Sequence, residues 1–116
     1  LLYDYPVATA SLAKTTTDKD GNLVARRFEL YMNGLEIANA YDELADGQAL
    51  RVRFEQDNLA RKQRGLPVMP IDDNLLAACD ALPPCSGIAV GLERLLMVKV
   101  GAEKLEQVIA FPITQA

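Results

Sequence analysis

Apolar and polar positions alternate most regularly between residues 26 and 41. Two alternating runs, 26–32 and 35–41, flank the pair Asn33-Gly34. Both residues of this pair tolerate positive φ, which is typical of the type I′ turn of a β-hairpin. The pattern therefore predicts two antiparallel strands joined by a two-residue turn.

The turn also predicts which side chains share a face. It sets Tyr31 opposite Glu36 and Glu29 opposite Ala38, so that the two glutamates form a diagonal pair with backbones roughly 7–8 Å apart. One interpretation is a solvated face, because antiparallel sheets are often wet on one side. The other is a pair of hard oxygen ligands for magnesium held against a nucleotide triphosphate, since Mg²⁺ commonly takes one or two carboxylates plus phosphates.

The rest of the chain divides into short elements with clear boundaries. Proline and glycine stop them, and aspartates supply helix caps. Before the hairpin we expect a strand at 1–5 stopped by Pro6, a helical turn or irregular segment at 7–14, and an exposed polar loop at 15–22. After it we expect a solvated outer helix from the Asp46 cap to Arg64, and a second helix capped by Asp72 or Asp73 and stopped by Pro83-Pro84. The last elements are a glycine-flanked strand at 87–91, a buried helix at 92–100, and a short helix at 103–108.

Asn39, Tyr41 and Glu43 alternate, so a regular strand points all three the same way. An amide, an aromatic ring and an anion together suit an ammonium-bearing ligand. The alternative is simply the amphipathic end of a strand. Strict alternation puts Glu36 on the opposite face from Asn39, so a shared pocket requires a bulge or twist around residues 38–40.

Small residues and an arginine mark the last strand and the helix after it. Gly87, Ala89 and Gly91 provide a floor that lets backbone approach an adenine and an amino acid closely. Arg94 then enters at the start of a helix, where its planar fork suits a phosphate. The alternative treats the glycines as turn residues and Arg94 as half of a surface ion pair with Glu93.

Composition narrows the class of protein. With 116 residues, half of them hydrophobic, the chain has enough apolar material for one core, so we expect a single compact domain or a piece of one. A net charge of −4 argues against wholesale binding of nucleic acid.

Cys79 and Cys85, without any histidine, do not make a tetrahedral zinc site, and we expect reduced, buried thiols in a cytoplasmic protein. No apolar run reaches membrane length, and the start at Leu1 suggests a portion of something larger.

The segment 28–39, Phe-Glu-Leu-Tyr-Met-Asn-Gly-Leu-Glu-Ile-Ala-Asn, resembles the class II lysyl-tRNA synthetases. The likeness continues through Glu43-Leu44 and resumes from Pro83 to Met97, so it covers most of the chain. It implies an α+β fold: residues 1–116 form the C-terminal part of a class II aminoacyl-tRNA synthetase-like catalytic domain, an antiparallel sheet with flanking helices that contains motif 3. Motifs 1 and 2 of that family do not occur in these residues.

The resemblance also implies roles for individual residues. By this carry-over, Glu29 and Glu36 hold magnesium and ATP, and Arg94, the catalytic residue, binds the ATP tail beside Gly91. The lysine-like substrate is contacted by Asn39, Tyr41 and Glu43, above the floor made by Gly87 and Ala89. Two positions depart from the pattern: Ala40 replaces the usual glycine, and Glu93 stands where relatives often have aspartate.

Three passages, 53–58, 84–89 and 108–111, resemble short paralogs of these synthetases, the ligases that attach (R)-β-lysine to elongation factor P. Ala89 stands where lysyl-tRNA synthetases have glycine, and a single methyl is worth about 1–3 kcal/mol of discrimination. The resemblance implies a cytoplasmic, homodimeric parent that activates (R)-β-lysine or lysine with ATP and transfers it to a lysine of elongation factor P. The alternatives are a lysyl-tRNA synthetase that charges tRNA and a noncatalytic binding module with the same fold.

Overall fold

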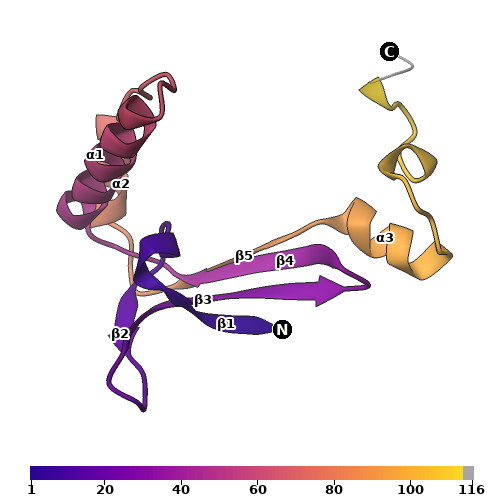
Figure 1. Ribbon diagram of the computed structural model, residues 1–116, viewed down its shortest axis with the longest axis horizontal. Helices are drawn as coiled ribbons and strands as arrows, with labels where there is room; N and C mark the ends of the chain where they lie inside the picture. The colour runs from indigo at the N-terminus through magenta and orange to yellow at the C-terminus, as the bar shows by residue number, and fades with distance from the viewer. Residues whose placement is uncertain (114–116) are drawn as a thin grey trace.

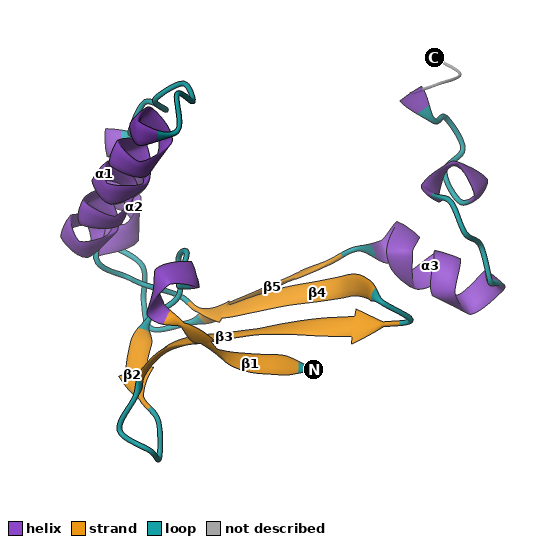
Figure 2. Cartoon of the chain, viewed as in Figure 1, coloured by secondary structure: helices purple, strands orange, loops and turns teal. Residues whose placement is uncertain are grey.

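The computed structural model describes residues 1–113 and is built on an antiparallel sheet flanked by helices (Figures 1 and 2). The strands are β1 (Leu2–Pro6), β2 (Thr15–Thr17), β3 (Leu23–Met32), β4 (Leu35–Asp42) and β5 (Ser86–Val90), in the order β1-β3-β4-β5 with β2 paired to the start of β3. The helices are α1 (Gly47–Gln63), α2 (Asp73–Asp80) and α3 (Leu92–Val100), with 3₁₀ turns η1 (Val7–Thr9) and η2 (Leu105–Gln107). The predicted α+β class is confirmed.

The elements form an open arrangement. Helices α1 and α2 lie side by side at one end of the sheet, and α3 continues from the other end (Figure 1). The radius of gyration is 17.4 Å, whereas a compact domain of this length has about 13 Å. Many large apolar side chains are correspondingly exposed, including Ile88 at 60% and Phe111 at 91%. Residues 1–113 therefore do not pack around one compact core.

The central hairpin forms as predicted, with one change in register. Asn33 and Gly34 have φ of 50° and 78°, as a type I′ turn requires, and Tyr31 pairs with Glu36. Glu29 pairs with Asn39, however, and the prediction that it faces Ala38 is wrong. The reason is one extra residue in β4, which shifts every pair beyond Tyr31 by one position.

Three other expectations are corrected. The predicted loop at 15–22 contains β2, whose β-branched threonines pair with the start of β3. Helix α3 forms where expected but is not buried: Met97 is covered, while Leu92 is 68% exposed. Cys79 and Cys85 are free as expected, but both are only half-buried.

Helix α1 begins at the predicted Asp46 cap, which accepts a hydrogen bond from Ala49 N at 2.8 Å. Arg53 of this helix, which as a whole was expected to be solvated, instead reaches the loop before β2. The Nη1 of Arg53 donates to the carbonyl oxygens of Ser11 and Ala13 at 2.6 and 2.7 Å, which ties α1 to the loop before β2. Within residues 1–113, no helix has both the length and the apolar content needed to cross a bilayer.

Gly47 lets α1 and α2 approach closely. Its amide donates to Asp80 Oδ1 at 2.6 Å, and a Cβ at this position would lie 2.4 Å from the carbonyl oxygen of Leu76. That oxygen belongs to helix backbone and has little freedom to move. The two helices therefore depend on a residue without a side chain at this contact.

We predict that Gly47→Ala lowers the free energy of unfolding by about 1–3 kcal/mol, the usual cost of overpacking a tight contact. Urea unfolding of the full-length protein measures it. Gln48→Ala, at the next and exposed position, is the matched control and should change stability by less than about 0.5 kcal/mol. Equal stability of the two variants would contradict the close-approach explanation.

Candidate functional site

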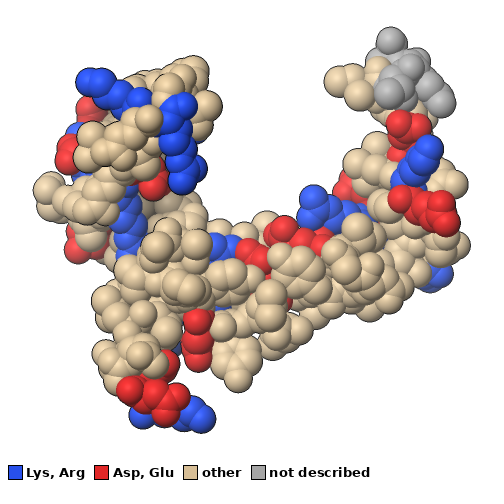
Figure 3. All heavy atoms as spheres, in the orientation of Figure 1, with Lys and Arg blue, Asp and Glu red and all other residues tan. Residues whose placement is uncertain are grey.

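One face of the sheet collects most of the side chains that the sequence analysis singled out. Residues paired directly across neighbouring strands point to the same face. Two such rows cross β3, β4 and β5, namely Arg27–Tyr41–Gly87 and Glu29–Asn39–Ala89. Basic and acidic side chains gather along the sheet in the hollow between the α1–α2 pair and α3 (Figure 3). We call the surface around these rows the site face.

Two strand irregularities bring further side chains to the site face. In β4 the extra residue is Ile37, so that Glu36 joins the same face as Asn39. We predicted such a bulge at 38–40, and it lies one position earlier. In β1 the register shifts at Asp4, whose φ is 55°, and this shift turns Tyr5 toward the site face.

Glu29 is a buried carboxylate of the site face, with 9% of the residue's surface exposed. The phenols of Tyr5 and Tyr31 both donate to its Oε2 at 2.6 Å, and Arg27 Nη2 donates to its Oε1. Hydrogen bonds from Tyr31 and Tyr5, and then the charge of Arg27, hold the pKa of Glu29 below its ordinary value, although burial opposes them. The same carboxylate raises the pKa of Tyr5 to about 12. The negative charge of Glu29 is therefore compensated by three donors from the protein itself.

The donor set of Glu29 and Glu36 fits a magnesium ion. A carboxylate has about four lone-pair sites, and the three donors to Glu29 leave one free at Oε1. The carboxylate of Glu36 is 38% exposed and has only a loose ion pair, with Arg94. Residues 1–113 contain no cluster of three or more potential metal ligands, so the chain offers two hard oxygens and leaves the other positions to phosphate and water.

Arg27 is a site residue that the sequence reasoning missed. Its guanidinium lies 4.4 Å from the ring centre of Tyr5 and 5.1 Å from that of Tyr41, and its side chain is 9% exposed. We expected the Tyr41 ring to attract a substrate ammonium, but in the structure a cation of the protein itself already lies over it. The available signal was position: Arg27 alternates with Glu29 on the same strand and so shares its face.

Asn39, Tyr41 and Glu43 lie together, as their alternation predicted. Asn39 Nδ2 donates to the Tyr41 hydroxyl at 2.9 Å. The Glu43 carboxylate lies over Gly87, because a Cβ on Gly87 would be 2.3 Å from Glu43 Oε1. Within residues 1–113 this carboxylate has neither a hydrogen bond nor an ion pair, whereas the amide of Glu43 is anchored to Cys85 O at 3.0 Å. An unpaired anion beside a glycine leaves room for a cationic group.

Arg94 and Gly91 join the glycine-flanked strand to the acidic hairpin. Gly91 precedes α3, and its amide donates to Ile37 O at 2.8 Å, which fixes it to the β4 bulge. The Arg94 side chain lies against Gly91, donates from Nη1 to Glu36 O at 2.8 Å, and stands 3.8 Å from Glu36 Oε2. Half of the Arg94 side chain remains exposed, so its fork has donors to spare for a ligand.

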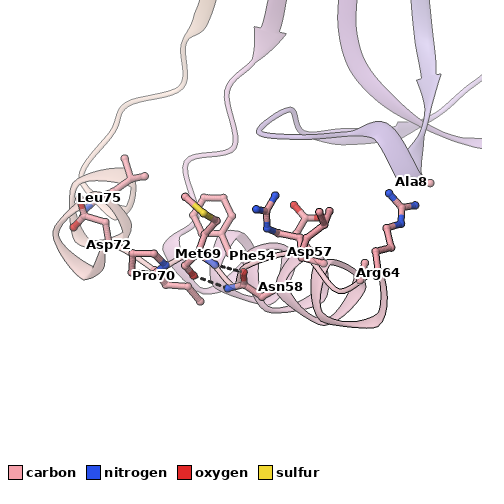
Figure 4. A pocket seen from close by; sticks show the side chains of 13 residues that line it. Ala8, Phe54, Asp57, Asn58, Arg64, Met69, Pro70, Asp72 and Leu75 are labelled. Atoms are coloured by element: carbon pink, nitrogen blue, oxygen red, sulfur yellow. Dashed lines mark hydrogen bonds between the residues drawn. The ribbon is translucent and has the colours of Figure 1, made fainter.

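A cavity of about 640 Å³ lies elsewhere, between α1 and the loop that precedes α2 (Figure 4). Phe54, Met69 and Leu75 provide apolar walls, and Asn58 holds the loop through two hydrogen bonds to the Met69 backbone, at 2.8 and 2.9 Å. No residue of the two site-face rows lines it. This cavity therefore belongs to the packing of the helical arm and not to the site face.

Known proteins resemble this chain over nearly its whole length. A family model described as "tRNA synthetases class II (D, K and N)" matches residues 1–115. The chain is 51% identical over 116 residues to the "Elongation factor P--(R)-beta-lysine ligase" of Yersinia enterocolitica, 49% to that of Klebsiella pneumoniae strain 342, and 50% to that of Yersinia pestis strain Pestoides F. Each match covers 99% of this chain and 35% of the relative, so the chain spans about a third of the length of these proteins. The chain belongs to the class II tRNA synthetase family.

Proposed function

We propose that this chain is the C-terminal part, with motif 3, of the catalytic domain of an ATP-dependent ligase that transfers (R)-β-lysine, or lysine, to a lysine of elongation factor P. The observation that carries the proposal is the row Glu29–Asn39–Ala89 across three strands, with Arg94 attached to Glu36 at its end. It brings the acidic hairpin and the glycine-flanked strand onto one surface. The names of the relatives support the choice of amino acid and acceptor.

The nucleotide end of the site is formed by Glu29, Glu36, Gly91 and Arg94. When bound, magnesium would supply positive charge to the phosphates of ATP, held by Glu36 and the free lone pair of Glu29. Arg94 contributes the guanidinium that meets the phosphate tail, and its long 3.8 Å pair with Glu36 costs little to give up. Gly91 leaves space for the Arg94 side chain to lie flat beside the strand.

The amino-acid end is formed by Asn39, Tyr41, Glu43, Gly87 and Ala89. The unpaired Glu43 carboxylate suits one amine of the substrate, because a charge-assisted hydrogen bond there replaces no existing partner. The Asn39 amide orients the substrate through its remaining donor and acceptor sites. The methyl of Ala89 lies opposite Asn39 and narrows the floor where the second amine is placed, which supports a preference for the displaced amine of β-lysine.

Two displacements make up the reaction. The substrate carboxylate attacks the α-phosphorus of ATP, the bond to pyrophosphate breaks, and an acyl-adenylate forms. The acceptor amine then attacks the acyl carbon, loses a proton, and expels AMP. No side chain of this chain is a nucleophile in either step, so its contribution is orientation and charge stabilisation.

The open shape supports the proposal that these residues work as part of a larger catalytic domain. Apolar side chains such as Ile88 and Leu92 are more than half exposed and need a covering surface. We further propose a cytoplasmic, homodimeric parent without a membrane partner. The free thiols of Cys79 and Cys85 are consistent with a reducing compartment.

The test uses the full-length protein in pyrophosphate exchange with (R)-β-lysine and with lysine, followed by transfer to elongation factor P or to tRNA. We expect exchange with at least one of these amino acids and acylation of elongation factor P. Acylation of tRNA alone would favour the lysyl-tRNA synthetase alternative. Absence of any heat of ATP–magnesium binding in calorimetry would favour the noncatalytic module. The isolated 116-residue chain is expected to be inactive, because it contributes only part of the ATP site.

Glu36→Gln tests the metal assignment. The change keeps the shape of the side chain and the Glu36 backbone acceptor but removes a charged ligand. Loss of a residue that only supports a metal ligand lowers metal affinity about 10- to 100-fold. For loss of a ligand itself, we expect the half-saturating magnesium concentration for exchange to rise by at least that factor. Glu93→Gln, in the exposed first turn of α3, is the control. Equal magnesium dependence in both variants would exclude Glu36 as a ligand.

Gly87→Ala tests the assignment of Glu43. The new methyl would lie 2.3 Å from Glu43 Oε1, so the carboxylate must move, whereas the fold is preserved because the displaced atom ends a flexible side chain. We expect KM for the amino acid to rise about tenfold or more, as loss of a hydrogen bond to a charged group predicts. Ser86→Ala, the neighbouring residue whose partner Asp42 lies on the opposite face, should leave KM unchanged. An unaltered KM in Gly87→Ala would remove Glu43 from the amine site.

A further inference from the structure

We propose that Arg27 is a positioning residue that couples the magnesium–ATP end of the site to the amino-acid end. This inference rests on the function proposed above and deepens it. The coupling is carried by one nitrogen: Arg27 Nη2 donates both to Glu29 Oε1 and to Asn39 Oδ1, the latter at 3.3 Å. Glu29 belongs to the nucleotide end and Asn39 to the amino-acid end, so a single group holds one residue of each.

The guanidinium is also held by its other terminal nitrogen and by two aromatic rings. Its Nη1 donates to the carbonyl oxygen of Thr9 at 2.8 Å, and the rings of Tyr5 and Tyr41 lie within cation–π distance. The Tyr5 and Tyr41 rings also pack on the small core of Ala10, Ala13 and Ala25. Arg27 therefore has one position available, and that position sets where both of its Nη2 acceptors lie.

Arg27 determines the orientation of the Asn39 amide. Because Oδ1 of Asn39 faces the guanidinium, Nδ2 must face the Tyr41 hydroxyl, as the 2.9 Å hydrogen bond confirms. An amide with both ends fixed presents only its second lone pair and second N–H to a substrate. Without the guanidinium, the Asn39 amide could rotate by about 180°. Its NH₂ group would then stand where its oxygen now stands, so a substrate would meet a donor in place of an acceptor.

Self-stabilisation alone does not account for this placement. The Nε of Arg27 is buried and has no hydrogen-bond partner among residues 1–113. A buried N–H without an acceptor lowers the free energy of unfolding. Pairing with Glu29 alone does not require the guanidinium to leave one of its nitrogens in that state. Nε is left without a partner because the two Nη groups point toward Thr9, Glu29 and Asn39 together.

Lysine at position 27 is the informative substitution. Arg27→Lys keeps a positive charge beside the buried Glu29, but a point charge lacks the planar fork that reaches three acceptors. In the full-length enzyme we expect KM for the amino acid and the half-saturating magnesium concentration each to rise about tenfold, with a smaller change in kcat. Arg26→Lys is the matched control, since Arg26 is exposed and pairs with Asp42 on the opposite face.

A double-mutant cycle separates positioning from support of the fold. If Arg27 acts on the amino acid through Asn39, then Arg27→Lys added to Asn39→Ser raises KM for the amino acid no further. Asn39→Ser by itself should also raise the half-saturating magnesium concentration, although residue 39 is not a metal ligand. This second measurement stands even if Arg27→Lys fails to fold.

The outcomes are distinguishable. A wild-type enzyme without exchange activity overturns the proposed function, and the inference falls with it. An active wild type whose Arg27→Lys variant behaves like Arg26→Lys, or loses kcat with both saturation constants unchanged, overturns the inference alone. Failure of Asn39→Ser to alter the magnesium dependence also overturns it.

Discussion

A carboxylate removed from water has to be surrounded by donors, and Glu29 meets this requirement with side chains from two strands. Tyr5 comes from β1, and Arg27 and Tyr31 come from β3. The Arg27 guanidinium extends the network to β4 through Asn39. This network favours one arrangement of the strands, because displacing β1, β3 or β4 would remove partners from the buried Glu29 carboxylate or from Arg27. The register of the sheet and the geometry of the site are therefore fixed by the same contacts.

The two strand irregularities explain why this geometry is only partly readable from sequence. Asn33-Gly34 specifies the turn, and through it the pair Tyr31–Glu36, by a local backbone preference. The extra residue at Ile37 has no such local signature, since its position depends on which face of β4 the sheet buries. The requirement that Glu36 and Asn39 share a face nevertheless predicted that a bulge exists. At Asp4, by contrast, nothing in the segment Leu-Leu-Tyr-Asp-Tyr-Pro distinguishes a regular strand from a shifted one.

The helices show the same division between local and long-range information. The Asp46 and Asp72 caps and the stops at Gly65 and Pro83 predicted where α1 and α2 begin and end, because caps act within one turn. The apolar pattern of α3 predicted a helix that buries one face, but such a pattern does not indicate which surface covers that face. In residues 1–113 most of it is exposed. The expectation of a solvated α1 missed the contact of Arg53 for a similar reason. Its acceptors, on Ser11 and Ala13, are some forty residues away in sequence.

The charge balance of the site face bears on which substrate it accepts. Three carboxylates, Glu29, Glu36 and Glu43, face two guanidiniums, Arg27 and Arg94. Arg27 is committed to Glu29 and is screened by aromatic rings, so it does not compete for an incoming anion. Arg94 is half-exposed and has only a long ion pair with the Glu36 carboxylate besides its hydrogen bond to Glu36 O, so its guanidinium could turn to a phosphate and leave that carboxylate to a metal ion. Glu43 is then the anion without a partner, and a diamino acid supplies the missing charge with the amine that an ordinary amino acid lacks. The unpaired Glu43 carboxylate is thus the feature that supports the proposed lysine-like substrate, and the floor beneath Asn39 is the feature that supports the proposed choice between α- and β-lysine.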